Sequence, residues 1–171
     1  ADDPPKPRFT IVNQQGKHYS KRDGAAFVGD FREQGFLAHA LFNYLALLGW
    51  SPGNDREKMS RDELIVDFTL DRVRSGPSQM DIRKLTHLNS QYVAELPPDV
   101  FEKEIRRRLG DMPWFTSADP AYARKVEALM QSRTHLFTYS SEWIYFFSDE
   151  YPVDAKAAEK FLRQPGRADI L

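Results

Sequence analysis

The stretch Leu37-Ala-His-Ala-Leu-Phe-Asn-Tyr-Leu-Ala-Leu-Leu-Gly49 decides the fold. Its leucines recur at the three- and four-residue spacing of an amphipathic helix, and a glycine ends the pattern. The surrounding apolar run from Phe36 to Trp50 is shorter than the roughly 20 helical residues that span a bilayer, and it is interrupted by His39 and Asn43. We therefore expect a core helix, and no membrane contact.

The composition is that of an ordinary globular protein. The 171 residues include 24 basic and 25 acidic side chains, with 41% hydrophobic residues, which fits one domain or two small ones. The chain contains no cysteine, which excludes disulfides, thiolate metal sites and thiol nucleophiles and indicates a cytoplasmic protein. The net charge of -1 argues against a nonspecific DNA binder but allows a local basic patch. The beginning has no secretory signal pattern.

Helical periodicity dominates from residue 25 onward. Ser60 precedes Glu63 by the three residues of a capping box, and Asp81 is placed to cap the helix that follows it. Prolines at the first helical position predict two more helix starts, after Pro97 and after Asp119. A last amphipathic helix is expected over residues 153–162.

The N-terminal part differs from this pattern. Ala1 to Pro7 is rich in proline and predicts an unstructured arm. Phe9 to Val12 followed by Asn13-Gln-Gln-Gly16 predicts a short hairpin. The fold class we predict is therefore all-α behind a short N-terminal hairpin, with residues 110–119 as the boundary between two helical subdomains.

The loop Ser20-Lys21-Arg22-Asp23-Gly24 is the first candidate for chemistry. Two adjacent cations and the backbone N–H groups of a glycine-ended loop can face phosphate oxygens. Taken alone, the same five residues are more often an exposed basic turn, so the loop by itself does not establish phosphate binding.

The wider context of that loop resembles a known family. The colinear segments are Ser20 to Ala25, Gly35 to Leu37, Ala40 to Gly53, Ser60 to Leu64, Asp81 to Leu85, Leu88-Asn89, Ala128 to Met130, Phe146-Phe147, Tyr151 to Val153 and Lys160 to Leu162. In this order and spacing they strongly resemble bacterial glutamyl-tRNA synthetases, which are class I aminoacyl-tRNA synthetases. The likeness runs from about residue 4 to residue 162.

The resemblance implies three parts. Residues 1–24 would be the end of the catalytic domain with the Ser-Lys-Arg loop, residues 25–112 a multi-helix stem-contact domain, and residues 113–171 the first part of a helical anticodon-binding domain. The chain would be a middle to C-terminal part without the Rossmann catalytic half, because no His-Ile-Gly signature and no βαβ alternation occur in it. It would contribute tRNA docking, anticodon recognition and a loop for ATP-dependent glutamate activation, and would not be competent alone. The alternative is a stand-alone helical module, derived from a synthetase, that binds RNA or protein without catalysis.

The resemblance also implies roles for single residues of the loop. Lys21 would contact the triphosphate of ATP, Arg22 would support it, and Ser20 would shape the loop, so Lys21 and Arg22 are the catalytic candidates. His18 and Tyr19 replace the lysine and leucine that begin the family's signature. ATP would be a substrate, used with magnesium in the full-length enzyme, and we expect no cofactor bound to this chain.

Four residues are implied in binding glutamate tRNA. Lys84, His87 and Asn89 would face the inner elbow of the tRNA, where folded RNA is held through phosphates and ribose hydroxyls. Arg133 would read the last base of the anticodon, a task for which the planar guanidinium is suited. The alternatives are a solvated helix face for the first three and a helix-end charge for Arg133.

Two conspicuous groups have simpler explanations. The run Arg106 to Arg108 lies beside acidic residues and is typical of a solvated helix face. The aromatic residues near the C-terminus are expected to build core and helix contacts: Trp143, Tyr145, Phe146 and Phe147. No two of the four histidines are four residues apart, so we predict no metal site.

Overall fold

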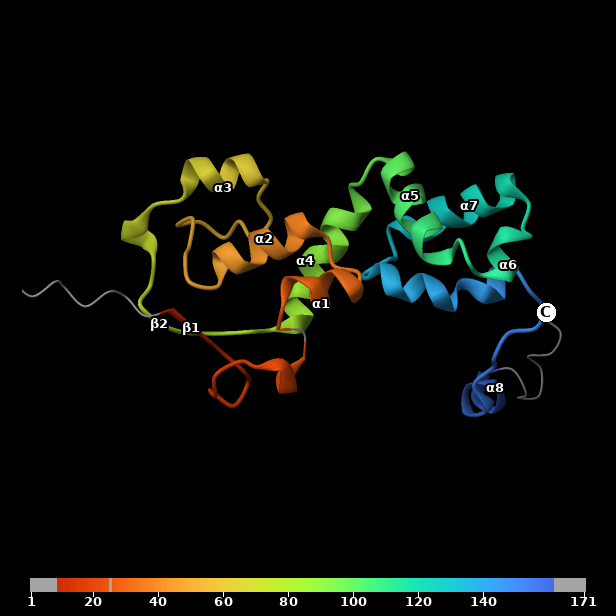
Figure 1. Ribbon diagram of the computed structural model, residues 1–171, viewed down its shortest axis with the longest axis horizontal. Helices are drawn as coiled ribbons and strands as arrows, with labels where there is room; N and C mark the ends of the chain where they lie inside the picture. Colours follow the sequence, from red (N-terminus) through yellow and green to blue (C-terminus); the bar gives the residue numbers. More distant parts are fainter. Residues whose placement is uncertain (1–8, 25, 162–171) are drawn as a thin grey trace, which may run out of the picture.

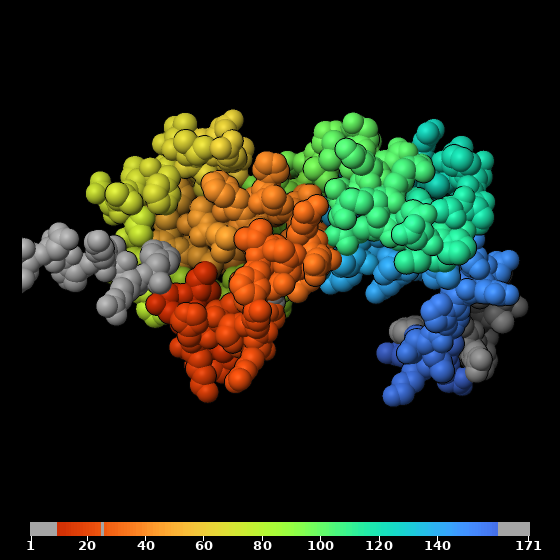
Figure 2. Space-filling view, in the orientation of Figure 1, coloured from red at the N-terminus to blue at the C-terminus, as the bar shows by residue number. Residues whose placement is uncertain are grey.

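The structure is a computed structural model that describes residues 9–24 and 26–161, and it consists of two lobes joined by helix α4 (Ile82–Ala94) (Figure 1). We call residues 9–81 the N-terminal lobe and residues 97–161 the C-terminal lobe. The space-filling view shows the narrowing between them (Figure 2). The predicted arm Ala1 to Pro7 and Leu162, the end of the last predicted helix, lie outside the described residues.

The N-terminal lobe is built around the helix that the opening stretch predicts. Its helical elements are α1 (Val28–Glu33), α2 (Ala38–Leu47), α3 (Arg61–Asp67) and two short 3-10 helices, η1 (Lys21–Asp23) and η2 (Leu70–Arg72). One face of α2 packs on α4 through Leu41 and Tyr44, in a core that includes Leu85 and Leu88. A second, smaller cluster of Trp50, Met59 and Leu64 holds α3 against the end of α2.

The C-terminal lobe contains α5 (Pro98–Leu109), α6 (Pro113–Thr116), α7 (Pro120–Gln131), the 3-10 helix η3 (Phe137–Phe146) and α8 (Ala155–Phe161). Helix α5 packs on α7 and on η3, and its Phe101 and Ile105 are completely buried. Trp143 is buried in the same core, while Phe146 and Phe147 are partly buried against it. Only Tyr145 of the predicted core aromatics is exposed, at 47%.

The all-α prediction is wrong because the N-terminal lobe contains a two-stranded parallel sheet. Strand β1 (Phe9–Val12) pairs with β2 (Gly76–Gln79) in a register that places Thr10 opposite Pro77. The predicted hairpin is also wrong, since the turn after β1 returns only as far as a single bridge between Val12 and His18. The partner strand comes from far along the chain, and its sequence Gly-Pro-Ser-Gln has no apolar alternation that could have predicted it.

The predicted helix starts are confirmed by their capping contacts. Ser60 Oγ accepts a hydrogen bond from the Glu63 N–H at 3.2 Å, and the Glu63 carboxylate accepts from the Ser60 N–H at 2.7 Å. The side chain of Asp81 accepts from two backbone N–H groups at the start of α4. Helices α5 and α7 begin at the prolines expected to start them.

The two lobes are joined by a buried side chain. Asn89 of α4 is completely buried, its Oδ1 accepts from the Leu37 N–H at 2.8 Å, and its Nδ2 donates to the His135 carbonyl at 2.6 Å. Leu37 is the N-cap of α2, and His135 precedes η3, so one amide connects α4 to both lobes.

Further contacts surround this amide. The Thr138 hydroxyl donates to the Gln34 carbonyl at 2.9 Å, and the Phe137 N–H donates to the Gly35 carbonyl at 3.4 Å. Arg108 of α5 donates to the carbonyls of Arg32 and Glu33, at the C-terminal end of α1, where a cation is favoured. The carbonyl groups of residues 32–35, at the end of α1 and in the segment that leads toward α2, are thereby bound by α5 and by the beginning of η3.

Arg108 departs from the predicted solvated face, whereas its two neighbours follow it. Arg106 pairs with Glu102 at 2.8 Å and Arg107 with Glu104 at 2.9 Å, both on the exposed side of α5. Arg108 is half-buried, and burial lowers the pKa of its guanidinium. Its long side chain reaches the end of α1 in the other lobe. The order of residues along α5 gives no indication of this contact.

Substitution of Gly35 tests the close approach of the lobes. Gly35 has φ of +94°, and a Cβ there would lie 2.7 Å from the Phe137 backbone nitrogen. We expect Gly35→Ala to lower the free energy of unfolding by about 1–3 kcal/mol or more, measured by urea denaturation. The control is Gly29→Ala within α1, where nothing lies within 4 Å and a gain of about 0.5–1 kcal/mol is expected. Equal effects of the two variants would contradict the close approach.

Glu127 predicts a pH dependence of stability. This α7 side chain is 4% exposed with no partner for Oε1 among the described residues, and burial raises its pKa to about 7. Arg106 and Arg124 oppose that shift and Glu102 adds to it. Because the folded state holds the proton more tightly, stability is full below the ordinary value of 4.5 and is lost as the pH rises through about 7.

We expect a decrease of about 1–2 kcal/mol in unfolding free energy between pH 5 and pH 8, allowing for solvent screening. Glu127→Gln should abolish most of this decrease, while Glu142→Gln, at an exposed carboxylate of η3, serves as the control. A decrease of unchanged size in Glu127→Gln would show that another group causes it.

Candidate functional site

Ser20 shapes the candidate phosphate loop by capping η1. Its hydroxyl accepts a hydrogen bond from the Arg22 N–H at 3.4 Å, and the Asp23 carboxylate accepts from both the N–H and the hydroxyl of Ser20 at 2.9 Å. This reciprocal arrangement fixes the backbone of the first turn. The prediction that Ser20 shapes the loop therefore has a geometric basis, whereas its contact with ATP stays a prediction.

Asn13 anchors the loop from the turn after β1. Its Nδ2 donates to Asp23 Oδ1 at 2.7 Å, and its Oδ1 accepts from the N–H groups of Gln15 and Lys17. Hydrogen bonds from the Asn13 side chain, and then from Ser20, lower the pKa of Asp23 below its usual value of 3.8. Asn13 was predicted only as a turn residue, although asparagine's tendency to bond nearby backbone is the signal that points to this role.

Lys21 and Arg22 project from this fixed turn into solvent. Both side chains are exposed, and the Lys21 ammonium lies 4.3 Å from the centre of the Phe27 ring. Neither forms an ion pair among residues 9–24 and 26–161. Two cations of this kind are available to a charged ligand, which is what an interaction with developing phosphate charge requires.

The predicted RNA contacts on α4 divide between two faces. Lys84 and His87 are exposed on one side, where Lys84 Nζ donates to Glu57 at 2.5 Å and the His87 ring lies 3.1 Å from Gln91 Nε2. Asn89 lies on the opposite, buried side. Its amide is engaged in joining the lobes and offers no polar atom to RNA, so the structure replaces its predicted RNA contact with a structural role.

Arg133 follows the C-terminal end of α7 and is exposed. The Gln131 amide just before it donates to the carbonyls of Val93 and Leu96, at the C-terminal end of α4. Arg133 therefore belongs to the end of α4 opposite to Lys84, about ten residues or roughly 15 Å along the helix. The structure does not bring the two cations together, but it holds them on one continuous framework.

The cleft beside Lys84 adds a cation that the sequence analysis missed. It has a volume of about 710 Å³ and lies between the loop 49–57 and residues 74–78, with Arg74 and Lys84 among its lining residues. Arg74 is exposed and has no side-chain partner among the described residues. The local sequence Arg72-Val-Arg-Ser75 gives no signal of such a cleft.

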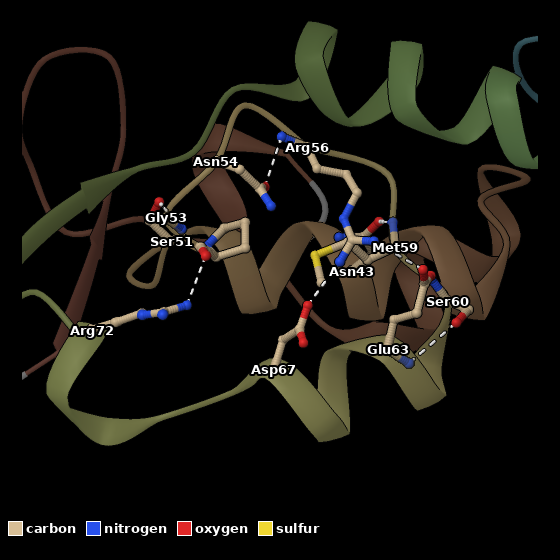
Figure 3. Close-up of polar contacts among 11 residues, drawn as sticks. Asn43, Ser51, Gly53, Asn54, Arg56, Met59, Ser60, Glu63, Asp67 and Arg72 are labelled. Atoms are coloured by element: carbon tan, nitrogen blue, oxygen red, sulfur yellow. Dashed lines mark hydrogen bonds and ion pairs between the residues drawn. The ribbon is translucent and has the colours of Figure 1, made fainter.

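Other arginines near the cleft are occupied in holding its wall. Arg56 donates to Glu63 at 3.0 Å and to Asp67 at 2.7 Å on α3, and Arg72 donates to the Pro52 carbonyl at 2.7 Å (Figure 3). The buried Asn43 accepts from the Met59 N–H at 2.9 Å and so fixes the end of this wall. Of the cations that line the cleft, Lys84 is paired with Glu57, another lining residue, and Arg74 has no side-chain partner among the described residues.

Neither a metal site nor a membrane span is found in the part of the chain that the structure describes. No three His, Asp or Glu side chains there gather closely enough to hold a metal ion. None of the helices in residues 9–24 and 26–161 has the length and apolar character to cross a bilayer.

Comparison with known proteins relates this chain to the aminoacyl-tRNA synthetases. Residues 4–87 match the sequence model of a family described as tRNA synthetases class I (E and Q), catalytic domain. The matched region includes both strands, the Ser20 to Gly24 loop and the first half of α4. The class I catalytic domain is a Rossmann-like α/β fold, so the match also overturns the all-α prediction.

The most informative relatives are glutamate–tRNA ligases. The chain is 38% identical over 157 residues to that of Desulforudis audaxviator (strain MP104C), covering 89% of this chain and 31% of the relative. It superposes with a TM-score of 0.75 and 26% identity on a glutamate tRNA ligase from Elizabethkingia meningosepticum CCUG26117 in complex with its amino acid, covering 94% of this chain and 35% of that one. The glutamate–tRNA synthetase of Elizabethkingia anophelis gives the same score and identity over 88% and 34%.

The chain is thus homologous to glutamate–tRNA ligases, which are ATP-dependent enzymes, and it spans about a third of their length. We predicted that only residues 1–24 belong to the catalytic domain and that the rest follows it. This prediction is wrong, because the match to the catalytic-domain model extends over residues 4–87. The division at residues 24 and 112 stays a prediction.

The pKa of Asp23 offers a test of the loop's architecture. Its lowered pKa means that its capping contacts are present above the ordinary value of 3.8 and are lost as the pH falls through the lower folded value. We expect the Ser20 amide signal to titrate below pH 3.8 in an NMR pH series. Asn13→Ala should move that inflection upward, while Gln14→Ala should leave it in place. An unchanged inflection in Asn13→Ala would contradict the anchoring role of Asn13.

Proposed function

We propose that this chain is the part of a glutamate–tRNA ligase that carries the phosphate-contacting loop and a surface for tRNA. The observation that supports this most is the exposed Lys21-Arg22 pair on a turn fixed by Ser20 and Asp23, inside the region that matches the class I catalytic domain. The substrates would be ATP, glutamate and glutamate tRNA, and the setting would be the cytoplasm.

The loop would act on the activation step. A glutamate carboxylate attacks the α-phosphate of ATP, a bond to pyrophosphate breaks, and negative charge grows on the phosphoryl and leaving oxygens. Lys21 would meet the triphosphate and Arg22 would support it, each with its charge already in place and little to reorganise. Magnesium would accompany ATP, and the described residues contain no cluster of His, Asp or Glu side chains that would hold it.

The tRNA surface would extend along α4 and the end of α7. Lys84 and His87, with Arg74 across the cleft, offer donors to phosphates and ribose hydroxyls. Arg133, near the far end of α4, would read the last base of the anticodon. Because α4 and α7 are joined through Gln131, the spacing between these contacts is fixed by the protein.

Catalysis by the chain alone is tested by pyrophosphate exchange. The matched relatives are about three times longer, and we propose that activation needs the parts of them that this chain does not match. The purified 171-residue chain should show no glutamate-dependent ATP–pyrophosphate exchange above background. Exchange that disappears in Lys21→Ala would overturn the proposal that the chain is incomplete as a catalyst.

Two substitutions should distinguish base reading from phosphate contact. Arg133→Ala should remove discrimination between tRNAs that differ only in the last anticodon base, a loss of about 1–3 kcal/mol on the preferred tRNA. Lys84→Ala should weaken every tRNA equally and reduce the salt slope by about one unit. The measurement is a fluorescence titration of glutamate tRNA variants at several salt concentrations.

Lys103→Ala, which removes an exposed lysine of α5 with no ion pair among the described residues, is the control for general charge. If Arg133→Ala loses the same factor on every tRNA, Arg133 is a phosphate contact or a helix-end charge and the anticodon role fails. If Lys84→Ala matches the control, α4 is a solvated face.

A further inference from the structure

Phe27 occupies the N-cap position of α1, where its side chain has no capping function. The position favours serine, threonine, aspartate or asparagine, whose side chains accept a hydrogen bond, and a phenyl ring cannot do so. The Asp30 carboxylate instead accepts from the N–H groups of Ala26 at 3.1 Å and of Phe27 at 3.0 Å. The ring itself is 55% exposed, so neither capping nor core packing accounts for it.

Among the described residues, Lys21 is the cation that lies over the ring. The Lys21 ammonium lies 4.3 Å from the ring centre, within the distance at which a cation is attracted by an aromatic face. Asp30 is close enough that the lysine charge adds to the two backbone hydrogen bonds, the larger causes, in lowering the pKa of its carboxyl. The ammonium of the candidate catalytic lysine is therefore held on the α1 side of the loop.

The cation–π contact between Lys21 and Phe27 is weak enough for the ammonium to leave the ring when a stronger partner binds. A cation over an exposed ring gains less free energy than a lysine gains from charge-assisted bonds to phosphate oxygens. A hydrogen-bonded ion pair with a carboxylate would be harder to leave. Arg22, the neighbouring cation, has no such contact among the described residues, so the ring selects one of the two.

We propose that Phe27 is a positioning residue for Lys21, whose ammonium rests on the ring until a triphosphate withdraws it. The inference rests on the proposed phosphate role of Lys21 and extends it to a residue outside the Ser-Lys-Arg signature. The resting contact competes with phosphate binding, so it sets the concentration of triphosphate at which the loop responds.

The resting contact is tested by NMR of the whole chain with lysine labelled at Cε, with Lys21→Arg identifying the signal. Ring currents should shift the Lys21 Cε protons upfield in the wild type and in Phe27→Tyr, which keeps the ring. Phe27→Leu should abolish the shift, and Phe42→Leu, at an exposed phenylalanine of α2, should retain it. Absence of the shift in the wild type would overturn the proposal.

The competition is tested by titrating the same proteins with inorganic tripolyphosphate. The upfield shift should disappear as tripolyphosphate saturates the wild type. Phe27→Leu should bind about 2- to 5-fold more tightly, because the lysine no longer has to leave the ring, while Phe27→Tyr and Phe42→Leu bind as the wild type does.

Two outcomes separate this inference from the proposed function. If tripolyphosphate binds through Lys21, as judged by loss in Lys21→Ala, but Phe27→Leu leaves both affinity and shift unchanged, the positioning role is wrong and the loop's phosphate role stands. If tripolyphosphate does not bind, or Lys21→Ala does not weaken it, the phosphate role fails for this chain and the competition fails with it.

Discussion

The buried amide of Asn89 is the contact on which the arrangement of both lobes depends. It connects α4 to the start of α2 and to the segment before η3, through bonds of 2.8 and 2.6 Å. Both partners are backbone groups, and loss of the amide would leave each unpaired at a cost of about 1–3 kcal/mol. Gly35 brings the two backbones close enough for this bond, and Arg108 adds a charged contact at the end of α1. The lobes therefore share one interlocked junction.

This junction matters for function because the candidate contacts lie on different sides of it. Lys21 is in the N-terminal lobe, Lys84 is on the connecting helix, and Arg133 is at the end of α7. If the connection between the lobes were flexible, the distances between these cations would vary. A ligand that contacts all three would then have to fix those distances on binding, at an entropic cost. A fixed junction instead holds these three cations at set distances from one another. The proposed resting contact of Lys21 with Phe27 would add an adjustable element to this arrangement.

The sequence predicted what depends on local chemistry and missed what depends on distant partners. The sequence predicted the capping pair Ser60 and Glu63 and the cap at Asp81, because helix ends are specified within a few residues. Strand β2 was not predicted, since Gly-Pro-Ser-Gln becomes a strand only by pairing with β1. Asn89 was predicted as an RNA contact because its segment resembles the stem-contact helix of glutamyl-tRNA synthetases, whereas its actual partners are 52 and 46 residues away. The resemblance to glutamyl-tRNA synthetases identified the family of the relatives correctly but placed too little of the chain in the catalytic domain.

Native-state hydrogen exchange in increasing urea tests most directly whether the junction makes the lobes one cooperative body. The Tyr44 amide reports on α2 in the N-terminal lobe, and the Ile105 amide on α5 in the C-terminal lobe; both side chains are buried. If the junction couples the lobes, the two amides should open with the same free energy and the same dependence on urea. Two separate isotherms in the wild type, with one lobe opening while the other stays protected, would contradict the account.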